Sequence, residues 1–288
     1  NFSCIMANVI KIKKGLDINL KGKASDVLLN GGKSESYAIV PDYYNGILPK
    51  VVAKVGEKVK AGSVLMIDKN RPEIKFVSPV SGEVTAVNRG EKRKVLSIVV
   101  KPDAQIEYEE FGKKNVASLQ GAEVKEVLLN AGMWPFIKQR PYDIVAAPLD
   151  TPRDIFVSAF YSAPLAPNFD FIVKGQEADF QTGLNALAKL TNGKVYVGVR
   201  SGSVVSGMKG VEIVEVEGPH PAANVGVQIN HIKPVNKGEV VWTVNPADVI
   251  VIGRLFNKGV ADFSRMVAIT GSETTERGYV KTISGCTI

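Results

Sequence analysis

Apolar and polar residues alternate in short runs between residues 47 and 100. Side chains of a strand point alternately to its two faces, so each run predicts a short strand with one buried face and one charged face. Turn residues interrupt the runs at Gly56, Gly62, Pro79, Gly82 and Gly90. Such frequent turns predict a compact all-β unit.

The same stretch resembles the barrel-sandwich fold of biotinyl and lipoyl carrier domains, through V-x-V-G-x-x-V-x-x-G-x-x-L followed by S-P-V-S-G-x-V. Those carriers attach their cofactor to a lysine at a hairpin tip, and Lys69 after Asp68 is the candidate here. Lys69 lies two residues too far from Ser78-Pro79 for the lipoyl pattern, Pro72 disfavours a tight hairpin, and no methionines flank it. We therefore expect an ordinary surface lysine, with a modified Lys69 as the less favoured alternative.

Beyond residue 103 the apolar spacing becomes helical and alternates with buried runs. A glycine after the first helix, and Asn245-Pro246 before the last, are typical helix-end signals. The alternation predicts a Rossmann-like α/β domain with parallel strands. The expected helices span 122–131, 178–190 and 246–257, and the expected strands span 143–147, 155–160, 194–199 and 211–216.

No phosphate-binding loop accompanies this α/β pattern. A dinucleotide site needs G-x-G-x-x-G between strand and helix, and the segment 198–202 reads G-V-R-S-G. Gly32-Lys33-Ser34 resembles the end of a P-loop, but Val27 stands where the first glycine is required. Both glycine pairs are therefore interpreted as turns.

Composition indicates a folded globular protein. The 288 residues are 45% hydrophobic and 23% charged, with a net charge of +7. The charge is uneven, because residues 1–103 hold 18 Lys/Arg against 10 Asp/Glu. A basic region of this kind could face anionic lipid, nucleic acid or an acidic partner. Lysines on the solvent faces of edge strands are the preferred interpretation, and no nucleic-acid signature is present.

The ends of the chain and the cysteines limit the choice of compartment. Cys4 and Cys286 form no C-x-x-C motif, which argues against a disulfide framework, a zinc site or an iron–sulfur site. No apolar run approaches the roughly 18 residues of a membrane span, and Asn1 to Ala7 is too short for a signal peptide. We expect Met6 to be the natural start, residues 1–5 to be an extension, and the protein to be cytoplasmic.

The sharpest local motif of the second half is G-P-H-P-A-A-N-V-G, residues 218–226. Two prolines flank His220 and restrict its backbone. His220 could act as a general acid or base, but a rigid connection with a hydrogen-bonded histidine is the preferred interpretation. His231, the other histidine, does not complete a metal-binding pattern with it.

Five segments in order along the chain resemble one family. They are IKKGLDINLKGKA (12–24), RPEIKFVSPVSGEVTAVNRGEKR (71–93), WPFIKQRPYD (134–143), GPHPAANVGVQINHI (218–232) and DVIVIGRLF (248–256). Together they resemble the NqrA family, which supplies one component of the sodium-translocating NADH:quinone oxidoreductases. That family is also similar to the NADH- and flavin-binding subunit of respiratory complex I and to one component of the Rnf electron-transfer complex.

The resemblance implies a peripheral subunit on the cytoplasmic face of the inner (plasma) membrane. Its complex oxidises NADH, reduces quinone (ubiquinone) and pumps sodium ions, while NAD, FAD, FMN and iron–sulfur groups are bound by other subunits. This chain would bind no redox cofactor or metal, would have a scaffold or quinone-side role, and would not be catalytic alone. The alternative is a soluble flavin- or nucleotide-dependent oxidoreductase related to the complex I subunit.

The resemblance also sets expectations for domains and site residues. We expect an α+β multidomain chain, with a barrel-sandwich domain over 1–103, a Rossmann-like α/β domain over 104–257, and over 258–288 the truncated start of a β-grasp-like ligand-binding domain. Aromatic and histidine side chains are suitable quinone contacts. The candidates are Trp134, Phe136 and His220, with core packing or loop rigidity as the competing interpretation of each.

Overall fold

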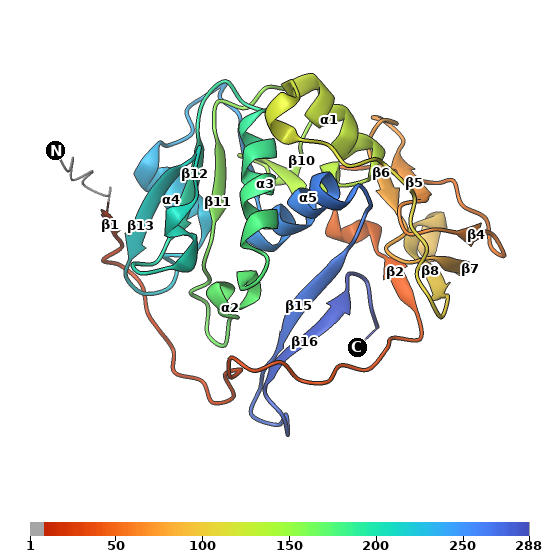
Figure 1. The fold of residues 1–288 in the computed structure, drawn as a ribbon, viewed down its shortest axis with the longest axis horizontal. Helices are drawn as coiled ribbons and strands as arrows, with labels where there is room; N and C mark the ends of the chain where they lie inside the picture. The colour runs from red at the N-terminus through yellow and green to blue at the C-terminus, as the bar shows by residue number, and fades with distance from the viewer. Residues whose placement is uncertain (1–8, 288) are drawn as a thin grey trace.

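The computed structural model describes residues 9–287, so the expectations for residues 1–5, Cys4 and Met6 lie outside the described residues. Three regions follow one another in Figure 1: a seven-stranded sheet with helices, a β unit at its side, and a two-stranded hairpin below both. No helix in the described part of the chain combines the length and apolarity needed to span a bilayer.

The β unit consists of a four-stranded and a three-stranded antiparallel sheet with strand orders β2-β8-β7-β4 and β3-β5-β6. Apolar side chains from both sheets fill the space between them, and Leu65, Ile74, Val84 and Ile98 are fully buried. The expected compact all-β unit is therefore present. Its strands are β2 (Tyr37–Ile39), β3 (Pro49–Val51), β4 (Lys58–Val59), β5 (Val64–Asp68), β6 (Lys75–Val77), β7 (Gly82–Arg89) and β8 (Val95–Pro102), with 3-10 turns η1 (Pro41–Tyr43) and η2 (Glu91–Arg93).

The second region is built on a sheet of order β1-β13-β12-β11-β14-β9-β10, in which β9 runs antiparallel to its neighbours β14 and β10. The expectation of parallel strands thus holds for the five strands from β1 to β14. The antiparallel pair belongs to a segment where two prolines, Pro135 and Pro141, leave room for only a short strand. The strands are β1 (Val9–Lys11), β9 (Ile137–Arg140), β10 (Ile144–Val145), β11 (Ile155–Ser158), β12 (Val195–Val199), β13 (Glu212–Glu217) and β14 (Val241–Val244).

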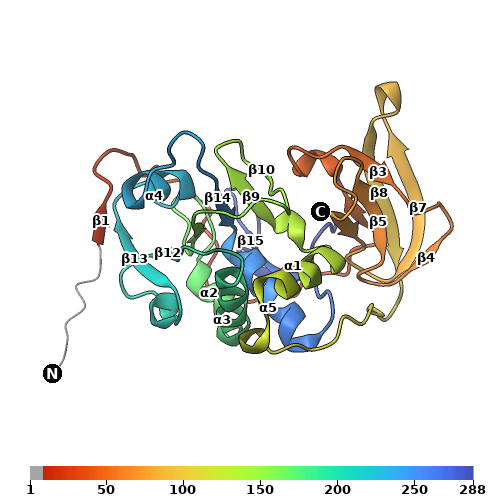
Figure 2. The ribbon, with the colours of Figure 1, turned by 90° about the horizontal axis from the view of Figure 1, so that it is seen from above.

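Helices cover the two faces of this sheet unequally. Helices α3 and α5 pack against each other on one face, and α4 lies on the other (Figures 1 and 2). Glycines permit the α3–α5 contact, because a Cβ on Gly253 would lie 1.7 Å from the carbonyl oxygen of Asp179. The helices are α1 (Gly121–Asn130), α2 (Phe169–Val173), α3 (Glu177–Ala188), α4 (Val225–Ile232) and α5 (Pro246–Lys258), with 3-10 turns η3 (Val116–Ser118), η4 (Trp134–Phe136) and η5 (Val204–Gly207).

Strand β1 joins this sheet, although the sequence assigned residues 1–103 to the β unit. It pairs in parallel with β13, and Ile12 continues the ladder by donating its N–H to the Glu217 carbonyl at 2.9 Å. The chain then runs along the surface to β2 (Figure 1). A three-residue strand is too short to show a period in the sequence, so alternation could not reveal this pairing.

The C-terminal part of the described chain is an antiparallel hairpin of β15 (Ser264–Ile269) and β16 (Gly278–Ile283). The segment near Leu28 runs beside β16, since Tyr279 donates its N–H to the Val27 carbonyl at 2.8 Å and accepts from Leu29 at 2.7 Å. Arg254 of α5 ties the hairpin to the helices by donating to the carbonyl oxygens of Asp262 and Ser264. A β-grasp-like third domain stays a prediction.

Candidate functional site at the carboxyl edge of the sheet

The topology places a crevice between β11 and β14. From β11 the chain proceeds through α3 to β12 on one side, and it returns through α4 to β14 on the other side. In open α/β sheets, ligands bind at the carboxyl ends of strands where the order reverses in this way. A cavity of about 650 Å³, within the size range of small-molecule sites, opens there and extends along β9 as far as Arg140, which pairs with Val241 at the amino end of β14.

Side chains from four parts of the chain line this cavity. They come from β9 and the turn after it, from the loop after β11, from the start of α4, and from the end of β14 with the start of α5. The lining residues are Phe136, Lys138, Arg140, Asp143, Ser158, Phe160, Tyr161, Ala223, Asn224, Val225, Gly226, Val227, Thr243, Val244, Asn245, Pro246 and Asp248.

Helix α4 is held against the sheet by one buried glutamine. Gln228 donates through Nε2 to Ser158 Oγ at 2.9 Å and to the Ala222 carbonyl at 3.0 Å. Gly198 of β12 makes room for it, because a Cβ there would lie 2.1 Å from Gln228 Oε1. The first glycine of G-V-R-S-G therefore serves helix packing, whereas the sequence favoured a turn.

His220 anchors the loop that leads into α4. Its Nδ1 lies 3.0 Å from Ser162 Oγ, its backbone N–H donates to Asp17 Oδ1 at 2.8 Å, and its carbonyl accepts from Leu16. Ser162 Oγ in turn accepts the N–H of Ala223 at 3.0 Å. These contacts match the rigid connection favoured from the sequence, and His220 does not line the cavity.

Trp134 and Phe136 share the 3-10 turn η4 but have different surroundings. Trp134 is fully buried, donates its indole N–H to the Ala146 carbonyl at 2.8 Å and packs edge-on against Trp242. Phe136 lines the cavity and also a smaller apolar pocket of about 200 Å³ beside β2. Of the three quinone candidates, Phe136 alone is placed on the cavity wall.

The cations of β9 were not singled out from the sequence. Lys138 and Arg140 point to the face that α4 partly covers, while the intervening Gln139 turns to the other face and accepts from Trp242 Nε1 at 3.3 Å. Burial lowers the pKa of Lys138, against the opposing influence of Asp143 and Asp248. Period-two spacing in I-K-Q-R was the available signal, but alternating charges normally indicate a solvated strand face.

Two partly buried tyrosines and an ion pair complete the polar surroundings. Burial raises the pKa of Tyr161 to about 12, with a further contribution from Asp248. Burial likewise raises the pKa of Tyr44 to about 12. Asp248 itself forms an ion pair with Arg265, whose guanidinium lies 5.3 Å from the ring centre of Phe136. Asp248 is therefore neutralised within the wall of the cavity.

Lys69 lies far from this cavity, on the turn between β5 and β6. Its side chain is exposed, and its backbone N–H donates to the Leu48 carbonyl at 2.7 Å. The preceding Asp68 is fully buried and accepts from Arg71 Nε at 2.8 Å, while Arg71 also donates to the Val145 carbonyl of β10. The Asp68 side chain thus orients an arginine that joins the two regions of the protein, and modification of Lys69 stays a prediction.

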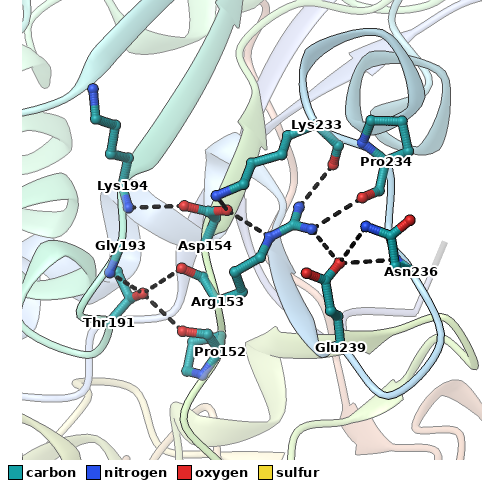
Figure 3. Close-up of polar contacts among 10 residues, drawn as sticks. All are labelled: Pro152, Arg153, Asp154, Thr191, Gly193, Lys194, Lys233, Pro234, Asn236 and Glu239. Atoms are coloured by element: carbon teal, nitrogen blue, oxygen red, sulfur yellow. Dashed lines mark hydrogen bonds and ion pairs between the residues drawn. The ribbon is translucent and has the colours of Figure 1, made fainter.

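The opposite, amino edge of the sheet carries a closed ion network (Figure 3). Asp154 is buried between Arg153 Nε at 2.8 Å, Lys233 Nζ at 2.9 Å and the backbone N–H of Lys194 at 3.0 Å. Burial alone would raise its pKa, but the hydrogen bonds from Lys233, Lys194 and Arg153 lower it. Arg153 also forms an ion pair with Glu239.

Two family models match the chain. The NqrA N-terminal barrel-sandwich hybrid domain covers residues 10–103, and the NqrA second alpha/beta domain covers residues 119–261. The chain belongs to the NqrA family. The barrel-sandwich and α/β predictions are thereby confirmed, as is the family resemblance drawn from the five segments.

Curated relatives in the NqrA family are similar over almost the whole chain. The proteins of Hahella chejuensis and Neisseria meningitidis serogroup A are 38% and 36% identical over 97% of this chain and 64% of their own length. That of Photorhabdus laumondii is 36% identical over 96% of this chain and 63% of its own. Each bears the name of a subunit of the Na(+)-translocating NADH-quinone reductase, and this chain spans about 64% of their length.

Proposed function

We propose that this chain is a subunit of a sodium-translocating NADH:quinone reductase, with a scaffold or quinone-side role. The observation that carries the proposal is its similarity, along 97% of its length, to relatives that bear this name. In this role the chain serves NADH oxidation, quinone reduction and sodium transport as part of the complex, and it is not an enzyme alone.

We further propose that the chain is peripheral, on the cytoplasmic face of the inner (plasma) membrane. Translocation of sodium requires proteins that cross a membrane, and attachment would come through contact with them. NAD, FAD, FMN and iron–sulfur groups would be held by those partners. The missing glycine-rich phosphate loops of the sequence support that division of labour.

Within the chain, we place the quinone contact most directly at Phe136. Its ring borders the small apolar pocket beside β2, where a quinone ring would meet it. Trp134 would support η4 from the core, and His220 would position the α4 loop. Phe136→Ala should raise the KM for quinone more than it lowers kcat in the assembled complex, with Phe160→Ala, which lines the large cavity but not this pocket, as the control.

The test of the proposed role in the complex is a mild-detergent purification of the tagged full-length protein from its native membranes. We expect flavin-bearing membrane proteins to co-purify, and the eluate to reduce quinone with NADH at a rate that sodium stimulates. Recovery of the protein without partners would contradict the proposal. An absorbance spectrum of that eluate would then show whether the chain is a flavoprotein, and intact mass would show any group on Lys69.

A further inference from the structure

Two cations, Lys138 and Arg140, line the cavity together with two carboxylates, Asp143 and Asp248, of which Asp248 is already paired with Arg265. Lys138 and Arg140 enter it from one face of β9, where Lys138 is paired with Thr243 of β14. Within the described residues, 9–287, Lys138 forms no ion pair, and the carboxylate of Asp248 is engaged by Arg265. The Lys138 ammonium lies 5.3 Å from the ring centre of Tyr44, and burial lowers its pKa against the opposing influence of Asp143 and Asp248.

The partly exposed guanidinium of Arg140 is incompletely paired. Its Nε is buried and has no hydrogen-bond acceptor in the described part of the chain. Asp143 Oδ1 lies 3.3 Å from it, within ion-pair range, yet the N–H does not meet that oxygen at hydrogen-bonding geometry. Buried guanidinium donors are normally satisfied, so an unbonded Nε indicates an absent acceptor.

The start of α4 faces the same guanidinium. Arg140 Nη1 would lie 3.9 Å from a Cβ at Gly226, the second residue of the helix. A helix N-terminus carries partial positive charge, so a guanidinium beside it is repelled unless an anion lies nearby. The side chain of Asn224, the N-cap residue, makes no capping hydrogen bond and leaves that anion position open.

We propose that this cavity binds the phosphoryl group of a small phosphorylated molecule. A phosphate dianion offers several acceptor oxygens, enough for Arg140, Lys138 and the first amides of α4 together. The cavity of about 650 Å³ leaves space for the organic part of such a ligand beside Phe160 and Tyr161. The site uses cationic side chains and a helix start instead of a glycine-rich loop. Phosphate binding at this site does not depend on the proposed role of the chain in the complex.

The carboxylate of Asp143 competes with a ligand for Arg140. It is half exposed and its backbone has a φ of 53°, on the turn that follows β9. Its charge repels a phosphate at Arg140, so its removal should strengthen binding. Arg140→Gln and Asp143→Asn therefore have opposite expected effects, which a general change in folding could not produce.

The test is calorimetric titration of inorganic pyrophosphate into the full-length protein at fixed ionic strength. We expect Arg140→Gln and Lys138→Met each to weaken binding at least about tenfold, because each removes a charge-assisted hydrogen bond. Asp143→Asn should strengthen it about threefold or more. Lys194→Met, which removes an exposed cation at the opposite edge, is the matched control and should leave binding unchanged.

Three results would overturn the site. The first is equal binding by wild type, Arg140→Gln and Lys138→Met, which would mean nonspecific attraction to a basic protein. The second is citrate binding as tightly as pyrophosphate, which would rule out a phosphoryl preference. The third is weaker binding by Asp143→Asn. Far-ultraviolet circular dichroism of each variant would show that it is folded. If Arg140→Gln does not fold, pyrophosphate binding by Lys138→Met tests the site.

Discussion

Two charged clusters of the seven-stranded sheet hold similar residues in opposite arrangements. At the amino edge, Asp154 is enclosed by Arg153, Lys233 and a backbone amide, and Arg153 is shared with Glu239 (Figure 3). In the cavity on the face that α4 partly covers, Arg140 has a buried Nε without a hydrogen-bond acceptor among the described residues. The Asp154 network is complete without a ligand, whereas the charges of the cavity are not fully paired.

This difference separates stability from binding within one sheet. In a buried ion network whose members all have partners, removal of one member destabilises the fold, because the remaining buried charges lose their compensation. An open cationic pocket can lose a charge at little cost to the fold. Substitutions in the Asp154 network should therefore affect the free energy of unfolding, and substitutions of the cations in the cavity should affect ligand binding.

The largest effect is expected from Asp154→Asn. The change leaves Arg153 and Lys233 without their shared carboxylate and should lower the free energy of unfolding by about 3 kcal/mol. Urea denaturation of the full-length protein measures it. Lys194→Met is the control, because its exposed pair with Glu212 should contribute nothing measurable. Equal stability of wild type and Asp154→Asn would contradict the distinction between a network that stabilises the fold and a cavity that binds a ligand.

The pH dependence of that difference follows from the lowered pKa of Asp154. Its carboxylate stabilises the fold above the pKa of an unfolded aspartate, 3.8, and this contribution is lost as the pH falls towards the folded value. The stability gap between wild type and Asp154→Asn should therefore be constant from pH 7 to about 5 and shrink below about 4. Urea midpoints collected across that range would reveal it, and a gap that persists unchanged at pH 3 would contradict the assignment.

Much of the fold could be predicted because its signals are local. Alternation between residues 47 and 100 indicated the barrel-sandwich unit, and helical spacing with end signals located α1, α3 and α5 within a few residues. The strand β1 is too short to show a period, and the alternation in β9 is of charged residues, which does not indicate burial. Both strands pair with partners more than 100 residues away. Tertiary contacts decide such segments, so no local pattern could place them.

The candidate site was predictable only in part. The prolines and small residues of the 218–226 motif marked His220 and the start of α4, and of these the start of α4 lines the cavity whereas His220 does not. Phe136 was chosen for its aromatic ring and lies on the cavity wall. Lys138 and Arg140 were missed because charges at alternate positions normally face solvent. Their burial follows from the position of β9 beside the switch point, which the sequence did not show.

A smaller effect is expected at the loop that leads into α4. Ser162→Ala removes the hydroxyl that meets His220 Nδ1 and accepts from the amide of Ala223. The loss should be about 1 kcal/mol in unfolding free energy, typical of a partly buried hydrogen-bonded group. Ser162→Thr keeps the hydroxyl and should recover most of it. An unchanged stability in Ser162→Ala would show that the α4 loop is held by its prolines alone.

The smallest effect on stability is expected from Arg140→Gln, and this is what sharpens the comparison. The guanidinium forms one imperfect ion pair and is repelled by the start of α4, so its removal should change the unfolding free energy by less than about 0.5 kcal/mol at low salt. Added pyrophosphate should stabilise the wild type but not the variant, since a ligand bound only to the folded state raises its stability. Urea titrations with and without pyrophosphate measure both quantities. A loss comparable to that of Asp154→Asn without ligand would place Arg140 among the structural charges, and the cavity, like the Asp154 network, would then need no ligand to complete its charge pairs.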